Sequence, residues 1–189
     1  MSAIKRVSLI GAGAIGSYYA SKIFDLDRDC MSLIAAGRRY DRLRKEGFII
    51  NGRHFSIPLR RPGDEKGPAD LIIVAVKHDH LQGAIRDIKS SVGEKAIILS
   101  IMNGIDSEEK IGSVYGMDKV LYGVAVGIDA VRIGNSVTYS KEGTLFFGEE
   151  KNSVPSERVR RVKELFDRAG IISETPQDMI RTLWWKFMI

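Results

Sequence analysis

The sequence has little of what metal centres and disulfide-linked folds require. Cys30 is the only cysteine in 189 residues, so we expect no disulfide within the chain and no cysteine-based metal site. Histidines are also few: His54 stands alone, and His78 and His80 lie two positions apart. Side chains at that spacing point away from each other on a helix, so this pair is better explained as a polar helix start. We therefore predict no metal site.

Long apolar runs and concentrated charge are missing as well. The longest apolar run, residues 71–76, is far shorter than the ~20 residues of a membrane span, and the first apolar segment leads directly into glycines instead of a signal-peptide cleavage site. The net charge is +5, and its lysines and arginines are spread along the chain. We therefore expect a cytoplasmic protein that binds neither membranes nor nucleic acid. A mildly basic surface suits an anionic small molecule, and a homodimer is compatible with the sequence.

What the sequence does contain is an alternation of short apolar strands and amphipathic helices. The run at 71–76 is continuous and rich in β-branched residues, which is typical of a strand buried on both faces of a parallel sheet. We predict strands at 5–10, 31–35, 71–76, 96–100 and 171–173, a hairpin of 48–50 with 54–59, and two or three antiparallel strands within 119–148. Helices are expected from residue 15 to about 26 and at 38–45, 79–90, 106–114, 155–169 and 176–189.

This order predicts an α/β fold with a doubly wound, mostly parallel sheet of the Rossmann type. The helix at 176–189 is still apolar at its last residues. We therefore assign residues 1–174 to a dinucleotide-binding domain and residues 175–189 to the first helix of a helical C-terminal domain that is otherwise missing. One side of this helix forms an apolar stripe of Met179, Ile180, Leu183, Trp184, Phe187 and Met188. We expect Trp184 and Phe187 of this stripe to lie in solvent unless another chain covers them.

A glycine-rich loop follows the first strand and opens the first helix, which is the context that a dinucleotide-binding fingerprint requires. Its first glycine permits a tight turn, its second lets the backbone approach a pyrophosphate, and its third allows the helix to pack closely on the strand. The first turn of the helix offers free N–H groups and a positive dipole end to phosphate. The predicted cofactor-binding residues of this loop are Gly11, Ala12, Gly13, Ala14, Ile15 and Gly16.

The choice of cofactor depends on the end of the second strand. An NAD site places Asp or Glu there to bond the ribose 2′-hydroxyl. Here Arg38 and Arg39 follow Ala36 and Gly37, and no acid precedes Asp41. Arginine suits a 2′-phosphate, so we predict NADP(H), although both arginines could also be solvated residues of a helix start.

Three further polar residues are candidates for the site. Lys77 and Asn103 follow predicted strands, so both should emerge at the edge of the sheet where ligands bind in such folds. Either could instead be structural, as a helix start or a turn former. Lys186 lies at the border of the apolar stripe of the last helix. It is either a lysine whose stem lies along apolar surface or a proton donor in a partly dry cleft.

Taken together, these residues resemble the ketopantoate reductase (2-dehydropantoate 2-reductase) family. The resemblance covers essentially the whole chain, and it lies in the order of its motifs rather than in the glycine loop alone. Those motifs are Gly11 to Gly16, Val76-Lys77, Asn103-Gly104-Ile105, Leu145-Phe146-Phe147-Gly148-Glu149, Asp178 and Leu183-Trp184-Trp185-Lys186.

The resemblance implies NADPH-dependent reduction of ketopantoate to pantoate, on the route to pantothenate and coenzyme A. By the match, Lys186 is the catalytic proton donor, Asn103 positions the substrate, and Lys77 lies near the nicotinamide. Family members often carry arginine where this chain has Ala36, and their C-terminal domain supplies more of the substrate site. Two alternatives stay open: a related NADP-dependent reductase of another 2-keto acid, and a non-catalytic NADP-binding module.

Overall fold

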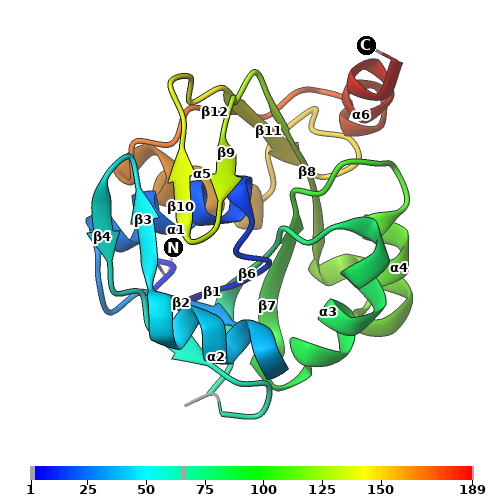
Figure 1. The fold of residues 1–189 in the computed structure, drawn as a ribbon. Coiled ribbons are helices and arrows are strands. Elements are labelled where there is room, and N and C mark those ends of the chain that lie inside the picture. The colour runs from blue at the N-terminus through cyan, green and yellow to red at the C-terminus, as the bar shows by residue number, and fades with distance from the viewer. Residues whose placement is uncertain (1–2, 65–66, 189) are drawn as a thin grey trace.

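A twisted eight-stranded sheet forms the centre of the protein (Figure 1). The computed structural model describes residues 3–64 and 67–188. Within them the strand order is β12-β11-β8-β7-β6-β1-β2-β5, and every neighbouring pair is parallel except β8 with β11. The strands are β1 (Val7–Ile10), β2 (Met31–Ile34), β5 (Leu59–Arg60), β6 (Ala69–Val74), β7 (Val92–Ser100), β8 (Val120–Val126), β11 (Thr144–Gly148) and β12 (Ser173–Glu174).

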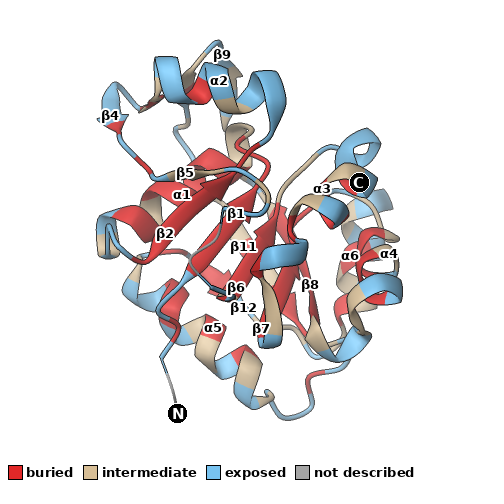
Figure 2. Ribbon diagram, turned by 90° about the horizontal axis from the view of Figure 1, so that it is seen from below, coloured by how far each residue is buried: buried red, intermediate tan, exposed pale blue. Residues whose placement is uncertain are grey.

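Helices cover both faces of this sheet, as Figure 2 shows from the buried strands between them. Helices α1 (Ala14–Leu26) and α5 (Glu157–Arg168) pack on one face, and α3 (Leu81–Asp87) and α4 (Ser107–Tyr115) pack on the other. Helix α6 (Met179–Met188) packs on β8 and β11, while α2 (Gly37–Glu46) follows β2. The predicted doubly wound α/β fold is confirmed.

The apolar run in β6 explains this layering. Leu71 and Ile73 belong to the core beneath α1 and α5, whereas Ile72 and Val74 belong to the core beneath α3 and α4. Successive side chains of a strand point to opposite faces, so a strand covered on both sides must be apolar at every position. The continuous run is the consequence of that double burial.

A second, four-stranded sheet stands beside the first, in the order β4-β3-β10-β9. Its strands are β3 (Phe48–Ile50), β4 (Arg53–Phe55), β9 (Val131–Ile133) and β10 (Ser136–Thr138). β3 and β4 form the expected hairpin at Asn51, whose φ of 48° is the left-handed conformation that such a turn requires. Parallel pairing of β10 with β3 joins segments that lie more than 80 residues apart, so local sequence gave no sign of it.

Several predicted boundaries were wrong. The strand predicted at 71–76 ends at Val74, so Lys77 does not follow it directly, and the arm predicted at 54–59 divides into β4 and β5, which belong to different sheets. The segment 119–148, where two or three strands were expected, contains four strands, and they also divide between both sheets.

The helix predicted at 79–90 is α3 flanked by the 3-10 turns η1 (His78–His80) and η2 (Lys89–Ser91). A third turn, η3 (Met117–Lys119), precedes β8. Strand 171–173 is β12 at Ser173–Glu174, and the last helix begins at Met179.

Candidate functional site

The glycine-rich loop joins β1 to α1, and two of its glycines are required by the packing of the chain itself. Gly11 has a φ of 105°, and a Cβ there would lie 2.4 Å from the backbone carbonyl of Ala75. A Cβ on Gly16 would lie 2.2 Å from the carbonyl oxygen of Gly11. Gly13 differs, because the nearest heavy atom to its Cβ position is 4.0 Å away. The protein therefore leaves open space at Gly13, where a dinucleotide fingerprint needs it for a phosphate.

The start of α1 lies next to that space. Gly13 is the N-cap residue and makes no side-chain capping bond, and the first turn of the helix has no acidic residue. The first amides of a helix lack intrahelical acceptors and carry partial positive charge. An anion fits at this position.

A pocket of about 230 Å³ lies in front of the loop. Its lining includes Gly13 to Gly16, Lys77 and Asn103. The residues predicted from the sequence to share the ligand-binding edge of the sheet therefore lie together. Lys77 and Asn103 are both exposed there.

Lys186 reaches the same place from α6. Its Nζ donates hydrogen bonds to Asn103 Oδ1 and to the carbonyl oxygen of Ala125, each at 2.7 Å. Burial lowers the pKa of the half-buried ammonium. Asn103 also lines a second pocket of about 230 Å³ with Lys186 and Phe187, so this asparagine borders both the glycine-loop pocket and the lysine pocket.

The position of Lys186 depends on how α6 is fixed to the sheet. Met179 and Leu183 are buried against Tyr122 and Val124 of β8. Other side chains of the helix are open to solvent: Trp184 is 45% exposed and Phe187 is 65% exposed, as expected.

The start of α6 is held by the segment that follows β11. Asn152 is buried, and its amide nitrogen donates to the carbonyls of Glu149 and Pro176, each at 2.9 Å. Lys151 Nζ lies 2.6 Å from Asp178 Oδ2, and the pKa of Asp178 is lowered by the backbone N–H of Arg181 and by Lys151. These contacts set the direction in which α6 leaves the sheet.

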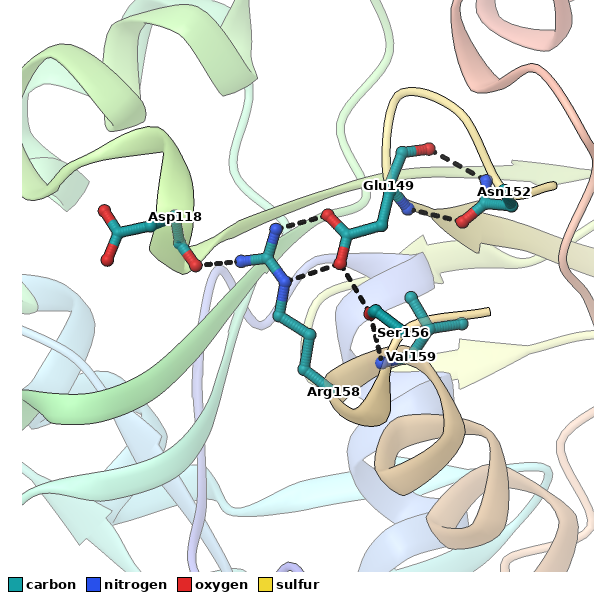
Figure 3. A network of polar contacts seen from close by, with 6 residues as sticks. All are labelled: Asp118, Glu149, Asn152, Ser156, Arg158 and Val159. Atoms are coloured by element: carbon teal, nitrogen blue, oxygen red, sulfur yellow. Dashed lines mark hydrogen bonds and ion pairs between the residues drawn. The ribbon is translucent and has the colours of Figure 1, made fainter. Parts of the chain in front are cut away.

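Glu149 continues this network to α5, as Figure 3 shows. Its Oε1 accepts hydrogen bonds from Ser156 Oγ and Arg158 Nε, each at 2.6 Å, and Arg158 also contacts its Oε2 and the carbonyl of Asp118. Burial acts to raise the pKa of Glu149, but the hydrogen bonds from Arg158 and Ser156 outweigh it, so the pKa is lowered. This network was not predicted from the sequence, because its members matter through their contacts with one another.

A larger pocket, about 530 Å³, opens at the end of β2 on the far side of Val76. Ala35, Ala36 and Arg39 line it from the β2 side, and His80 lines it from the first turn before α3. Arg38 is exposed and does not line this pocket, so of the two arginines only Arg39 borders it.

Two charged residues near the site were not singled out from the sequence. Arg132 of β9 donates from Nη1 to the carbonyl oxygen of Ala12, inside the glycine-rich loop. Glu108 is fully buried at the start of α4, behind the loop that carries Asn103. Asp106 is the N-cap residue of that helix, but its carboxylate accepts a hydrogen bond from Lys110 instead of from a backbone amide.

The arrangement can hold an anionic dinucleotide along the glycine-rich loop and present an ammonium group next to it. No cluster of three or more potential metal ligands occurs among residues 3–64 and 67–188. Over the same residues, no helix combines the length and apolarity needed to cross a membrane.

Comparison with known proteins identifies the family. The family model of ketopantoate reductase PanE/ApbA matches residues 7–152. A 2-dehydropantoate 2-reductase from Pyrococcus horikoshii is 28% identical over 193 residues, covering 97% of this chain and 60% of that protein. The crystal structure of 2-dehydropantoate 2-reductase from Geobacter metallireducens has a TM-score of 0.82 at 26% identity, over 96% of this chain and 61% of the other.

A more distant neighbour shows how widely the fold is shared. The ternary structure of D-mandelate dehydrogenase with NADH and anilino(oxo)acetate has a TM-score of 0.83 at 18% identity, over 96% of this chain and 60% of that chain. The chain thus spans about 60% of the length of these relatives. By the match over most of its length, it belongs to the ketopantoate reductase PanE/ApbA family.

Proposed function

We propose that this chain supplies the NADPH-binding part and the proton donor of an enzyme that reduces 2-dehydropantoate to pantoate, in the biosynthesis of pantothenate and coenzyme A. The observation that carries the proposal is the 2.7 Å hydrogen bond from Lys186 Nζ to Asn103 Oδ1. It places an ammonium next to the glycine-loop pocket, where a binding protein without catalysis would need none. Family membership supports the reaction class.

The residues fit a nicotinamide dinucleotide. The open space at Gly13 and the uncapped start of α1 suit the pyrophosphate. Lys77 and Asn103 line the same pocket and would lie near the nicotinamide. Arg39 borders the pocket at the end of β2, which suits the adenosine end.

The cofactor, when bound, supplies the hydride, and the protein residues manage the charge that the hydride leaves on the substrate oxygen. Lys186 gives its proton to that oxygen, because a partly buried ammonium next to it stabilises the developing negative charge. Asn103 accepts a hydrogen bond from Lys186 and so fixes the direction of the ammonium. Because burial lowers the pKa of Lys186, we expect activity to fall with rising pH earlier than an ordinary lysine would allow.

The preference for NADPH over NADH is part of the proposal. The D-mandelate dehydrogenase structure with NADH shares the fold, so the fold alone is compatible with either cofactor. Two arginines follow β2 where an NAD site would carry an acid, which favours NADPH.

The larger assembly is proposed from the family. We infer that residues 1–174 form the dinucleotide-binding domain and that residues 175–189 begin a helical domain that completes the substrate site. The resulting enzyme would be cytoplasmic, and a dimer is favoured by the dimeric ketopantoate reductase of Staphylococcus aureus, a structural neighbour with a TM-score of 0.76. On this view the 189-residue chain forms one wall of the cleft and turns over well below the ~1 s⁻¹ of slow ordinary enzymes.

The experiment is single-turnover formation of pantoate by the 189-residue chain at high protein concentration, with NADPH and a panel of 2-keto acids. We expect slow pantoate formation that Lys186→Met reduces roughly 10²–10⁴-fold without changing NADPH affinity. Arg181→Met removes an exposed charge from the same helix and serves as the matched control. Faster reduction of another 2-keto acid would assign the chain to that substrate, and a Lys186→Met chain that reduces its keto acid as fast as the wild type would contradict the role of Lys186 as proton donor.

A further inference from the structure

The loop that carries Asn103 is closed at its base by buried hydroxyl and carboxyl groups. Ser100 ends β7 and Ser107 begins α4, and their Oγ atoms are 2.8 Å apart. Ser107 Oγ donates to Glu108 Oε2, also at 2.8 Å, so its single proton is used and Ser100 is the donor of the other bond. All three side chains are buried. The carboxyl group of Glu108 is therefore the final acceptor of a chain that joins the two ends of the loop.

The same carboxyl group lies where β7 and β8 separate. The pairing of these strands ends at Leu99 with Leu121. Two residues further along β8, Gly123 passes so close to β7 that a Cβ there would lie 2.4 Å from the carbonyl oxygen of Ser100. Burial raises the pKa of Glu108 to about 7, and the backbone N–H of Gly123 is among the groups that limit this rise. Glu108 thus borders the ends of both strands.

Both hydrogen-bond acceptors of Lys186 lie directly beyond these strand ends. Asn103 is on the loop after β7, and Ala125 follows Gly123 by two positions on β8. Backbone groups of alternate residues point to the same side of a strand, so Gly123 and Ala125 share the edge of β8 that faces β7. Glu108 and Lys186 therefore occupy successive positions along that edge, where β7 has turned away.

An apolar side chain would fill the space of Glu108 at a lower cost in free energy. A buried carboxyl group loses its hydration, and the pKa of Glu108 is raised for that reason. An apolar side chain could not offer oxygen acceptors to Ser107 and to the end of β8. The carboxyl group is therefore suited to fixing the two strand ends relative to each other.

We propose that Glu108 is a positioning residue for Lys186: it holds the loop after β7 and the end of β8 at the separation at which Asn103 Oδ1 and the Ala125 carbonyl both accept from the ammonium. Glu108 lines neither the glycine-loop pocket nor the lysine pocket, so it acts through these two residues. The consequence for catalysis rests on the proposed function, in which a displaced ammonium transfers its proton more slowly.

The test measures by mass spectrometry how fast an amine-acylating reagent modifies Lys186 in the native chain. Glu108→Met keeps the volume but removes the acceptor oxygens, so it should release the ammonium and raise this rate roughly tenfold. Glu108→Gln keeps one acceptor oxygen and should restore most of the protection. Lys45 is exposed and serves as the reference for the reagent, and Lys22, which α1 holds in an ion pair, is the reference for general loosening of the fold.

Two further measurements complete the test. Ser107→Ala breaks the link to Ser100 without changing the carboxyl group, and it should raise the labelling rate of Lys186 in the same direction. In the reaction, Glu108→Met should lower the single-turnover rate at saturating NADPH roughly ten- to a hundredfold and leave the affinity for NADPH unchanged. Glu109→Gln changes an exposed neighbour on the same helix and is the control.

The outcomes separate this inference from the proposed function. Faster labelling of Lys186 alone, reversed in Glu108→Gln, would support the inference. Equal acceleration at Lys22 would mean that the whole fold has loosened, and it would overturn the inference, as would unchanged labelling of Lys186. Faster labelling with an unchanged single-turnover rate would overturn it too. Labelling needs neither cofactor nor substrate, so a wild-type chain that reduces no keto acid would contradict the proposed function while the labelling still decides whether Glu108 positions Lys186.

Discussion

Glu108 gives the strongest prediction about stability. Its carboxyl is fully buried in the first turn of α4, where Oε2 accepts a hydrogen bond from Ser107 Oγ at 2.8 Å and Oε1 has no partner among the described residues. Burial raises the pKa of Glu108 to about 7 from its ordinary 4.5, and hydrogen bonds from Ser107 and from backbone amides limit the rise. In the folded protein the group therefore keeps its proton at a pH where the unfolded chain has lost it.

The sign of the effect follows from proton binding. Between pH 4.5 and 7 the folded state binds more protons at Glu108 than the unfolded state, so the free energy of unfolding falls as the pH rises through this window. The difference of 2.5 pKa units, from 7 minus 4.5, limits the loss to about 3 kcal/mol. Between pH 5 and pH 8 the expected loss is about 2–3 kcal/mol.

The perturbation is Glu108→Gln, which keeps the shape and removes the titration. Urea unfolding of both proteins at pH 5, 6, 7 and 8 gives the free energy of unfolding at each pH. We expect the variant to gain about 2–3 kcal/mol relative to wild type between pH 5 and pH 8, because all other titrating groups are common to both. Glu109→Gln, an exposed neighbour, should show no such gain. Parallel pH profiles for wild type and Glu108→Gln would refute the reasoning.

Two further predictions concern the glycine loop and the Glu149 network. Gly16→Ala should lower the free energy of unfolding by about 2 kcal/mol or more, because its Cβ would lie 2.2 Å from the Gly11 carbonyl oxygen. Gly13→Ala should change the free energy of unfolding by no more than about 1 kcal/mol, but it should weaken NADPH binding. Urea unfolding and titration calorimetry measure both, and equal stability losses would contradict the distinction. Arg158→Met should destabilise the fold by roughly 1–3 kcal/mol at pH 7, because it leaves the Glu149 carboxylate partly buried without its cation. This loss of stability should shrink as the pH falls below 4.5, the ordinary pKa of a glutamate. A loss of stability that stays constant down to about pH 3 would count against the ion pair.

The parts of the fold that the sequence predicted are those with a local pattern. The glycine loop and the buried strand β6 are recognisable within a few residues, because the turn and the double burial each restrict residue type at consecutive positions. The pairing of β3 with β10 was not predictable in this way, because it depends on where two distant segments of the chain lie after folding.

The same limit applies to the site. Lys77 and Asn103 were placed correctly at one edge because the ends of parallel strands share an edge. The contact of Lys186 with Asn103 was not predicted, since it spans 83 residues; the family resemblance only assigned a role to each of the two residues. Arg132 had one local signal, the Gly134-Asn135 turn that marks its hairpin, but nothing in the sequence shows where that hairpin lies.

The most direct test of the central claim is titration calorimetry of the 189-residue chain with NADPH and with NADH at fixed salt. Arg39→Ala and Arg38→Ala are measured alongside, because Arg39 borders the adenosine-side pocket and Arg38 does not. The account predicts that both cofactors bind, that NADPH binds more tightly, and that Arg39→Ala reduces this preference more than Arg38→Ala does. Binding of neither cofactor to the wild-type chain would contradict the account.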